Sequence, residues 1–284
     1  AFSPERVDPG NTKWTTANTP IVVGGLTPAC TDLAATVTGQ IVTDVHRVSG
    51  PRAAEMEKLL ENIFRSVNIA LVNELARLCD RMGGVSMWEV VDAAATKPFG
   101  FMPFYPGPGL GGHCIPIDPY YLSWLARRYD FETNFITLSA RTNEEMPYYV
   151  VDAVIKAVAS QPVALSDAGV LVLGAAFKRN VDDVRHSPAI RIVELLRESG
   201  VKRIELSDPH VKSLRVNSAE YESVPVTEDL VRRNHVVVLV TDHDAYPYEM
   251  IAETASCIVD TRNGFARLGR KLHNVVLLGG GDFN

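Results

Sequence analysis

A long stretch of apolar residues at helical spacing, from about Pro51 to Met82, constrains the fold of this chain more than any other feature. The apolar positions recur at steps of three and four residues, which is the spacing of one helix face. They are Met56, Leu60, Ile63, Val67, Ala70, Leu71, Leu75 and Leu78. A helix of about 30 residues is roughly 45 Å long at 1.5 Å per residue. Because that exceeds the usual length of a globular helix, the sequence predicts a spine helix shared between domains or between subunits.

The pattern changes after Gln161-Pro162, where short apolar runs alternate with helical segments. The clearest amphipathic helix is 188–199, and the runs are 170–174, 203–207, 235–241, 257–260 and 275–278. Strands alternating with helices predict βαβ units and a parallel, Rossmann-like sheet. In such sheets ligands bind beyond the carboxyl ends of the strands. These ends carry the segments 174–178, 207–209, 241–243 and 260–262.

Before residue 161 the pattern is different, because helical segments predominate. Residues 20–25 form a short apolar strand that ends in glycines, followed by a helix near 27–40 and a possible strand near 41–47. Further helices are expected near 87–95, 119–128 and 143–160. We therefore expect an α/β protein in three parts: the end of an N-terminal α/β domain at 1–48, a central helical region with the spine helix at 49–160, and a Rossmann-like parallel-sheet domain at 161–284.

Composition narrows the class of protein and its partners. With 46% hydrophobic and 22% charged residues, the chain has an ordinary globular composition. Its net charge of -6 argues against a nucleic-acid partner. No run of about 18 apolar residues occurs, so no transmembrane helix and no membrane partner are expected. The cysteines lack metal-ligand spacing, which favours reduced thiols in a cytoplasmic protein and predicts no metal site. They are Cys30, Cys79, Cys114 and Cys257.

The strongest chemical signal is the glycine-rich loop within 105–122, which ends in Cys114 just before a predicted helix start at Asp118-Pro119. Glycines let a backbone approach a ligand closely. Unpaired N–H groups and the positive end of a helix dipole favour the thiolate of Cys114. A nucleophile, a tight turn and a carboxylate four residues later suit covalent catalysis. The other cysteines lie in or beside apolar segments and are expected to be inert.

The same loop also satisfies a dinucleotide pattern. Gly107, Gly109 and Gly112 match G-x-G-x-x-G, which needs a strand before it and a helix opening within it. The preceding residues 101–106 carry prolines that do not belong in a central strand. We therefore reject a dinucleotide site here.

Five segments, taken in their order, resemble the UDP-glucose/GDP-mannose dehydrogenase superfamily. They are 3–10, 55–62, the cysteine-loop run 97–119, 177–185 and 260–263. Within that superfamily the run 97–119 is most similar to the UDP-N-acetylglucosamine 6-dehydrogenase branch.

The resemblance implies an oxidoreductase of polysaccharide biosynthesis, with NAD as its cofactor, that oxidises the primary alcohol of a UDP-sugar in two steps. It implies that Cys114 attacks the aldehyde intermediate to give a thiohemiacetal and then a thioester, which water hydrolyses. The family's NAD-binding domain is expected before Ala1, with residues 1–48 as its end. We therefore expect a fragment that is inactive alone, and a homodimer formed through the long helix.

The resemblance also implies roles for four further catalytic residues. Asp118 would be an acid/base group; the alternative is a helix N-cap worth about 1 kcal/mol. Lys58 and Asn62 share one helix face at i, i+4 and would hold an alkoxide and order the sugar or water, the alternative being a solvated face. Glu5 resembles a substrate-side glutamate. Pro9 stands where the UDP-glucose branch has a second acidic residue, which argues against UDP-glucose.

The binding residues implied by the resemblance lie in the loop and at predicted strand ends. Those for the nucleotide sugar are Tyr105, Gly107, Gly109, Gly111, Phe177, Lys178 and Arg262. Arg185 is expected to face NAD. Guanidinium groups suit phosphate oxygens, and plain surface charge is the alternative. His113 adjoins Cys114 but is interpreted as structural.

Several functions remain open at this point. The substrate expected first is UDP-N-acetylglucosamine, followed by its N-acetylgalactosamine and N-acetylmannosamine counterparts and then UDP-glucose. A non-catalytic UDP-binding and dimerisation module is the main competitor from another class. A thioester-forming acyltransferase is weaker, because no Cys-His-Asn or Ser-His-Asp arrangement is visible.

Overall fold

The computed structural model describes residues 1–8 and 10–281, so Pro9 lies outside the described residues. The chain divides into two compact units. Unit 1 contains Ala1–Arg65 and Asp118–Phe131, and unit 2 contains Ser66–Ile117 and Glu132–Asn284. The predicted division into 1–48, 49–160 and 161–284 stays a prediction. The two compact units are defined by which residues pack together, and they divide the predicted central region between them.

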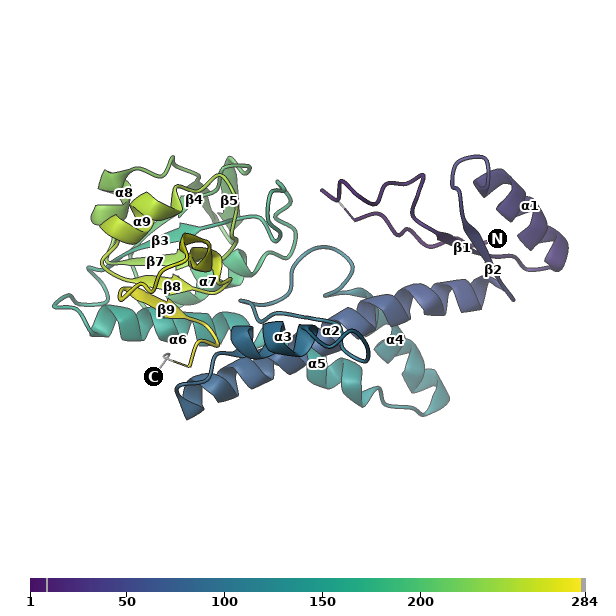
Figure 1. The fold of residues 1–284 in the computed structure, drawn as a ribbon, viewed down its shortest axis with the longest axis horizontal. Helices are drawn as coiled ribbons and strands as arrows, with labels where there is room; N and C mark the ends of the chain where they lie inside the picture. The colour runs from purple at the N-terminus through teal and green to yellow at the C-terminus, as the bar shows by residue number, and fades with distance from the viewer. Residues whose placement is uncertain (9, 282–284) are drawn as a thin grey trace. The chain divides into compact units, whose positions relative to one another are not determined.

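Unit 1 begins with a βαβ element made of β1 (Ile21–Gly24), α1 (Pro28–Thr38) and β2 (Val45–Val48), and its strands pair in parallel (Figure 1). Thr27 caps α1, since its side chain accepts the N–H of Cys30. The helix expected near 27–40 is confirmed, whereas the strand is shorter than the predicted 41–47. Unit 1 also holds α4 (Asp118–Ala126) and the short 3-10 helix η1 (Arg127–Tyr129).

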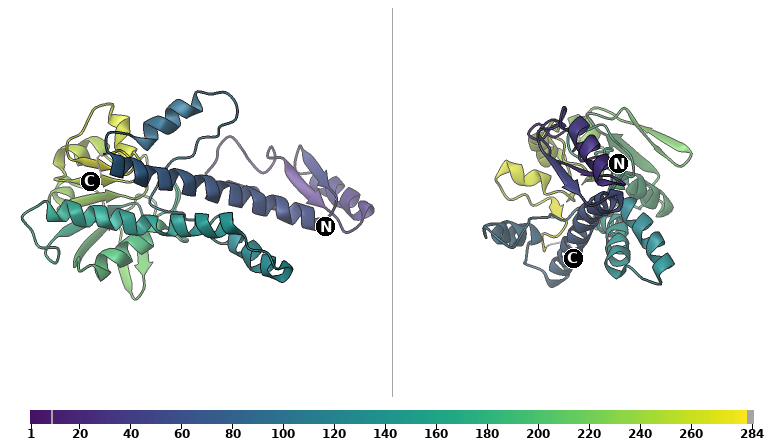
Figure 2. Two further views of the ribbon diagram at one scale, coloured as in Figure 1. Left: turned by 90° about the horizontal axis from the view of Figure 1, so that it is seen from below. Right: turned by 90° about the vertical axis from the view of Figure 1, so that its right-hand side faces the viewer.

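The predicted spine helix is confirmed as α2, which runs for 32 residues from Pro51 to Met82 (Figure 2). Its apolar residues do not all face the protein core. Ala54, Ala70, Val72, Ala76 and Cys79 are buried. An apolar stripe made of Met56, Leu60, Phe64, Leu71 and Leu78 remains exposed along the helix. The sequence pattern alone could not separate these two sets, because both recur at helical spacing.

Unit 2 contains the predicted parallel sheet, with strand order β4-β3-β7-β8-β9 (Figure 1). The strands are β3 (Gly169–Leu173), β4 (Arg203–Ser207), β7 (Val236–Leu239), β8 (Ile258–Asp260) and β9 (Val275–Leu277). Four helices pack on it: α6 (Met146–Ala159), α7 (Pro188–Glu198), α8 (Glu228–Arg232) and α9 (Tyr248–Thr254). The helix α3 (Met87–Ala95), also in unit 2, has the predicted bounds.

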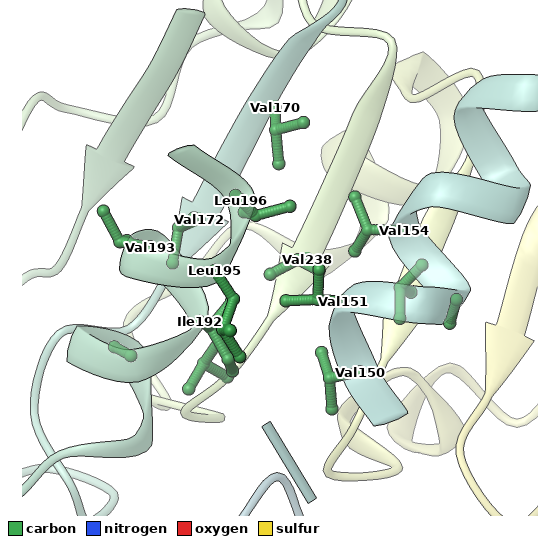
Figure 3. Close-up of a cluster of buried hydrophobic side chains, with 14 of the residues drawn as sticks. Val150, Val151, Val154, Val170, Val172, Ile192, Val193, Leu195, Leu196 and Val238 are labelled. Carbon is green, nitrogen blue, oxygen red and sulfur yellow. The ribbon is translucent and has the colours of Figure 1, made fainter. Parts of the chain in front are cut away.

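The two faces of the sheet are covered by different helices. Along β3 the side chains alternate, so that Val170 and Val172 join one buried cluster and Leu171 and Leu173 the other. The first cluster includes residues of α6 and α7. Figure 3 shows Val151 of α6 beside Val238 of β7 in this cluster. The second includes residues of α8 and α9. This is the doubly covered sheet expected of βαβ units.

Some elements differ from the prediction. The helix expected near 143–160 is confirmed as α6, whereas α5 (Asn134–Glu144) before it was not predicted. Pro147 lies in the first turn of α6 and has no N–H with which to continue the hydrogen bonding of α5, so the two helices are separate. The prediction also lacked the antiparallel hairpin of β5 (Ser213–Val216) and β6 (Ala219–Glu222). Its tight turn uses Asn217 at φ 53, a left-handed conformation that Asn tolerates.

Candidate active site

In unit 1 the predicted site residues Lys58, Asn62 and Asp118 each take part in a hydrogen bond. Asn62, fully buried on α2, donates from Nδ2 to the Asp118 carboxylate at 2.7 Å. Asp118 is the first residue of α4, so its carboxylate is held by a side chain from another helix. Lys58 donates to the backbone carbonyl of Glu5. The i, i+4 pair on α2 thus faces both the acid and the N-terminal segment.

The segment around Glu5 is anchored to α2 by its neighbour Arg6. The Arg6 guanidinium lies 3.2 Å from Glu57 and also pairs with Glu61, and it donates to the carbonyl of Pro20 at 2.8 Å. Burial, helped by the adjacent Glu61, raises the pKa of Glu57. The Glu5 side chain itself is exposed and accepts the N–H of residue 7. The structure therefore places the Glu5 backbone, rather than its carboxylate, against Lys58.

In unit 2 two buried asparagines hold the start of the cysteine loop. The N–H of Gly107 donates to Oδ1 of Asn73 on α2 at 2.9 Å. Asn73 in turn donates to Asn143 on α5 at 2.9 Å, and Asn143 donates to the carbonyl of Ser66. Sequence reasoning missed both asparagines, although Asn73 interrupts the apolar spacing of α2 and a buried amide needs a polar partner.

The loop glycines are needed where the segment 177–186 approaches the loop. A Cβ atom added to Gly111 would lie 2.4 Å from Cβ of Phe177, closer than real contacts allow. Gly112 has φ 86, and its N–H donates to the carbonyl of Arg185 at 2.9 Å. Phe177 and the loop therefore pack closely enough that only glycine fits.

Arg262 approaches the same loop from the end of β8. A Cβ atom added to Gly107 would lie 2.6 Å from a guanidinium nitrogen of Arg262. The turn that carries Arg262 is held by the buried carboxylate of Asp260, which accepts the N–H groups of Arg262, Gly264 and Phe265. Burial raises the pKa of Asp260. The predicted strand-end arginine thus lies at the glycine loop.

Tyr105, just before the loop glycines, contacts α3. Its hydroxyl donates to Asp92 of α3 at 2.6 Å, and its ring stacks on Trp88 with centroids 5.6 Å apart. The hydrogen bond to the Asp92 carboxylate raises the pKa of Tyr105. Lys178, next to Phe177, is half-buried. Gly109, with φ 133, packs against Pro147.

The four cysteines occupy different environments. Cys114 is half-buried in a turn, and its carbonyl accepts the N–H of Ile117. Cys79 is buried and Cys257 half-buried, and burial raises the pKa of both thiols. The expectation of an inert apolar site is wrong for Cys30, which is exposed and whose pKa is lowered by the Thr27 hydroxyl. The cause is its place in the first turn of α1, where Thr27 caps the helix.

The residue predicted to face NAD is Arg185. Arg185 is exposed beside the cysteine loop, pairs with Asp183 at 2.7 Å, and could contact a cofactor phosphate. The pattern at 107–112 has neither the strand nor the helix of a dinucleotide site, which confirms its rejection. Elsewhere in 1–8 and 10–281, a glycine ends β1 at Gly24, before α1, and another follows β3 at Gly174. A Cβ atom at Gly24 would meet the carbonyl of Gly50 at 2.2 Å, and one at Gly174 would meet Thr241 at 2.5 Å, so both turns pack on this chain itself.

The sequence matches two parts of one protein family. Residues 52–145 match the UDP-glucose/GDP-mannose dehydrogenase family, central domain, and residues 171–267 match its UDP binding domain. The chain belongs to this family. Members of the UDP-glucose/GDP-mannose dehydrogenase family are NAD-dependent enzymes.

Individual relatives agree on the family and differ in substrate. The chain is 36% identical over 250 residues to an NDP-N-acetyl-D-galactosaminuronic acid dehydrogenase from Ralstonia solanacearum, covering 87% of this chain and 56% of that protein. It is 37% identical to a UDP-N-acetyl-D-glucosamine 6-dehydrogenase from Pseudomonas aeruginosa, covering 79% and 52%. The structure of a UDP-D-ManNAc dehydrogenase from Pyrococcus horikoshii matches 99% of this chain and 64% of that one, with 30% identity and a TM-score of 0.84. The chain thus spans between half and two thirds of the length of these relatives.

Membrane-spanning helices and metal-binding clusters are both absent from the described part of the chain. None of its helices is both long and apolar enough to cross a membrane. In the same residues, no three or more His, Cys, Asp or Glu side chains gather as a metal site would require.

Proposed function

We propose that this chain carries the nucleophile and the nucleotide-sugar site of an NAD-dependent UDP-sugar 6-dehydrogenase. The observation that carries the proposal is the glycine loop of Cys114, which is packed between Arg262 and Phe177 within a unit that contains the UDP-binding domain. A cysteine on a loop that touches an arginine and an aromatic ring can face a bound sugar diphosphate. We propose UDP-N-acetylglucosamine as the substrate, with UDP-N-acetylmannosamine or UDP-N-acetylgalactosamine as alternatives, because the relatives divide among these sugars.

The proposed reaction uses the thiolate of Cys114 to hold the half-oxidised sugar. Two NAD, bound in succession, would each accept one hydride, one in each oxidation. After the alcohol becomes an aldehyde, the sulfur adds to its carbon and gives a thiohemiacetal. Loss of the second hydride and of the hydroxyl proton gives a thioester. Water then adds to the thioester carbon, the C–S bond breaks, and the carboxylate and the free thiolate result.

We propose for Asp118, Lys58 and Glu5 the roles that the family resemblance implies. Asn62 fixes one oxygen of the Asp118 carboxylate, so that Asp118 can take a proton from the alcohol or from the hydrolytic water. The Lys58 ammonium can stabilise the developing alkoxide. Glu5 is proposed as a substrate-side base. In unit 2, Lys178 and the loop around Gly109 are proposed to hold the diphosphate and the sugar, and Arg185 a phosphate of NAD.

We also propose that the chain forms a homodimer through α2. The support is the apolar stripe of Met56, Leu60, Phe64, Leu71 and Leu78, whose side chains are 44% to 63% exposed. A row of large apolar residues along one helix favours burial against a second protein surface. A second copy of α2 would provide that surface, and sedimentation at increasing chain concentration tests the assembly.

A calorimetric titration with UDP and with UDP-N-acetylglucosamine tests the proposed site. The expected result is binding of both, with additional affinity from the sugar. The chain alone is expected to form no NADH, because the described residues hold no dinucleotide cradle. Absence of UDP binding would overturn the proposed site, and NADH formation by the chain would overturn the expected inactivity.

Alkylation kinetics separate the proposed enzyme from a non-catalytic UDP-binding module. The exposed Cys30 would also react, so the experiment is best done in a Cys30→Ser background. A catalytic origin predicts that Cys114 reacts much faster than Cys79 and Cys257 and that UDP-sugar protects it. Equal rates without protection would favour the binding module.

A further inference from the structure

We propose that His243 and Asp208 form a buried clamp that positions Phe177 and Lys178 against the cysteine loop. Phe177 touches the loop directly, whereas the clamp residues lie beneath it and are at most 6% exposed. His243 would therefore be a positioning residue rather than a group that touches substrate. Its functional meaning rests on the nucleotide-sugar site proposed above.

The clamp forms where three neighbouring parallel strands end. Asp208 follows β4, His243 follows β7, and the segment 174–180 follows β3, which lies between them in the sheet. Nε2 of His243 lies 3.0 Å from a carboxylate oxygen of Asp208. The carboxyl ends of parallel strands are the usual place for ligands, so this pair lies directly below a functional edge.

Asp208 fixes the first part of the segment. Its carboxylate accepts the N–H groups of Ala175 and Ala176 at 2.8 and 2.9 Å, and its other oxygen accepts those of His210 and Val211. Burial alone would favour the neutral acid, but the hydrogen bonds from His243 and from the backbone hold the pKa of Asp208 below its usual value.

His243 fixes the far end of the segment and is itself fixed in one tautomer. The N–H of Asn180 donates to Nδ1 of His243 at 2.9 Å. Because Nδ1 accepts this bond, the ring proton must be on Nε2, where it is donated to Asp208. One neutral imidazole therefore links the carboxylate under Ala175 to the backbone of Asn180.

A second tether at the same end comes from the exposed side chain of Asp244. Asn180 donates to Asp244 at 2.6 Å, and the Asp244 N–H donates back to Asn180 at 3.0 Å. Asn180 has φ 58, a left-handed conformation that needs such support. Held at both ends, the segment has little freedom to move Phe177 away from Gly111.

The simpler interpretation is that His243 is only a structural residue of the core. Substitutions can distinguish this role from the proposed positioning role. His243→Phe keeps an aromatic ring and removes both hydrogen bonds. His243→Gln keeps an amide donor and an acceptor at a spacing similar to that of the ring nitrogens. Asn234→Ala is the matched control, because Asn234 is a buried polar residue at the opposite edge of the same sheet, bonded to Glu205 and Leu230.

The first readout is UDP affinity of the whole chain by calorimetry, compared with the melting temperature of each variant. We expect His243→Phe to weaken UDP binding about tenfold and His243→Gln by less than about threefold, where tenfold corresponds to about 1.4 kcal/mol. Asn234→Ala is expected to lower the melting temperature without changing the UDP affinity. An equal loss of affinity in Asn234→Ala, or none in His243→Phe, would overturn the clamp.

The second readout, amide hydrogen exchange at residues 175–180, does not depend on UDP. Exchange at Asn180 is expected to accelerate in His243→Phe and to stay slow in Asn234→Ala. If His243→Phe does not fold, Asp244→Ala loosens the same end from the surface and is expected to show the same acceleration. Unchanged exchange at Asn180 in these variants would refute the clamp. Wild-type chain that binds no UDP, with the exchange changes present, would instead refute the proposed site.

Discussion

Two glycine turns in this chain each lead to a cysteine near the start of a helix, but their glycines contact different things. In unit 1, Gly24 and Gly25 pack on the backbone of residues 50 and 31, and the nearby Cys30 is exposed in α1. In unit 2, the loop glycines pack on the side chains of Phe177 and Arg262, which come from distant strand ends. Glycines followed by a cysteine are therefore not enough to identify a functional site. A site is indicated by the side chains that the glycines allow to approach the loop.

The two turns also differ in the residues that hold them in place. The turn of unit 1 is supported locally, by the Thr27 cap and by Thr31, whose hydroxyl accepts the N–H of Gly25 at 2.9 Å. The loop of unit 2 depends on Asn73 and on the segment fixed by Asp208, both far away in sequence. Substitutions at these distant supports should therefore affect unit 2 and leave the turn of unit 1 unchanged.

The largest expected effect separates the two cysteines. With an NAD-binding domain supplied by a relative and fused to the chain, Cys114→Ala is expected to lower carboxylate formation by about ten thousandfold or more, because the thioester cannot form. Cys30→Ala is the matched control and should leave the rate unchanged. NADH and sugar acid are measured together. If Cys114→Ala retained more than about a hundredth of the rate, Cys114 would not be the nucleophile.

Asp208→Asn should produce the next largest effect, a loss of stability whose size depends on pH. At pH 7 the Asn side chain places an NH2 group where a carboxylate oxygen of Asp208 accepts backbone N–H groups. This loss of an acceptor should lower the free energy of unfolding by about 3 kcal/mol. The lowered pKa of Asp208 means that its stabilisation is present above the unfolded value of 3.8 and is lost as pH falls through the folded value. Urea unfolding should therefore show the gap between wild type and Asp208→Asn narrowing below about pH 4. A constant gap would argue against an ionised Asp208.

Asn73→Leu tests the other distant support. It leaves the N–H of Gly107 and Oδ1 of Asn143 without their partner, which should cost about 2 kcal/mol of stability. UDP affinity should fall as well, because the loop start is released. Glu74→Ala, an exposed neighbour on α2, is the control and should change stability by less than about 0.5 kcal/mol. Unchanged UDP affinity in Asn73→Leu would mean that the loop keeps its shape without the asparagine pair.

Gly111→Ala tests the close approach itself. The added methyl group would overlap Phe177, so a loss of about 1–2 kcal/mol and weaker UDP binding are expected. Gly50→Ala is a fair comparison, because its nearest atom, the carbonyl of Gly25, would be at an ordinary 3.6 Å. Thermal melts of both variants measure the difference. Equal melting temperatures would show that Phe177 can move aside at little cost.

The same contrast explains how much the sequence could predict. The bounds of α2 and of the sheet strands followed from periodicity, which is a local property of the chain. Cys114 and its loop were found because glycines and a cysteine are recognisable side by side. Asn73 and His243 were missed as supports because their partners lie 70 and 35 residues away in sequence, and no local pattern encodes such pairing. Cys30 was misjudged because it lies exposed in the first turn of α1, where the Thr27 cap also lowers its pKa.

The smallest expected effect sharpens the comparison of the two thiols. Thr27 donates its hydroxyl to Sγ of Cys30 at 3.1 Å and also caps α1, which together lower the pKa of Cys30. Thr27→Val removes both contacts, so alkylation of Cys30 near pH 7.5 should slow by about twofold to fivefold. The rate at Cys114, in the other turn, should not change, and mass spectrometry of the two labelled peptides reports both in one sample. Equal slowing at both cysteines would mean that loss of the α1 cap is felt in unit 2, and the two turns would then not be independent.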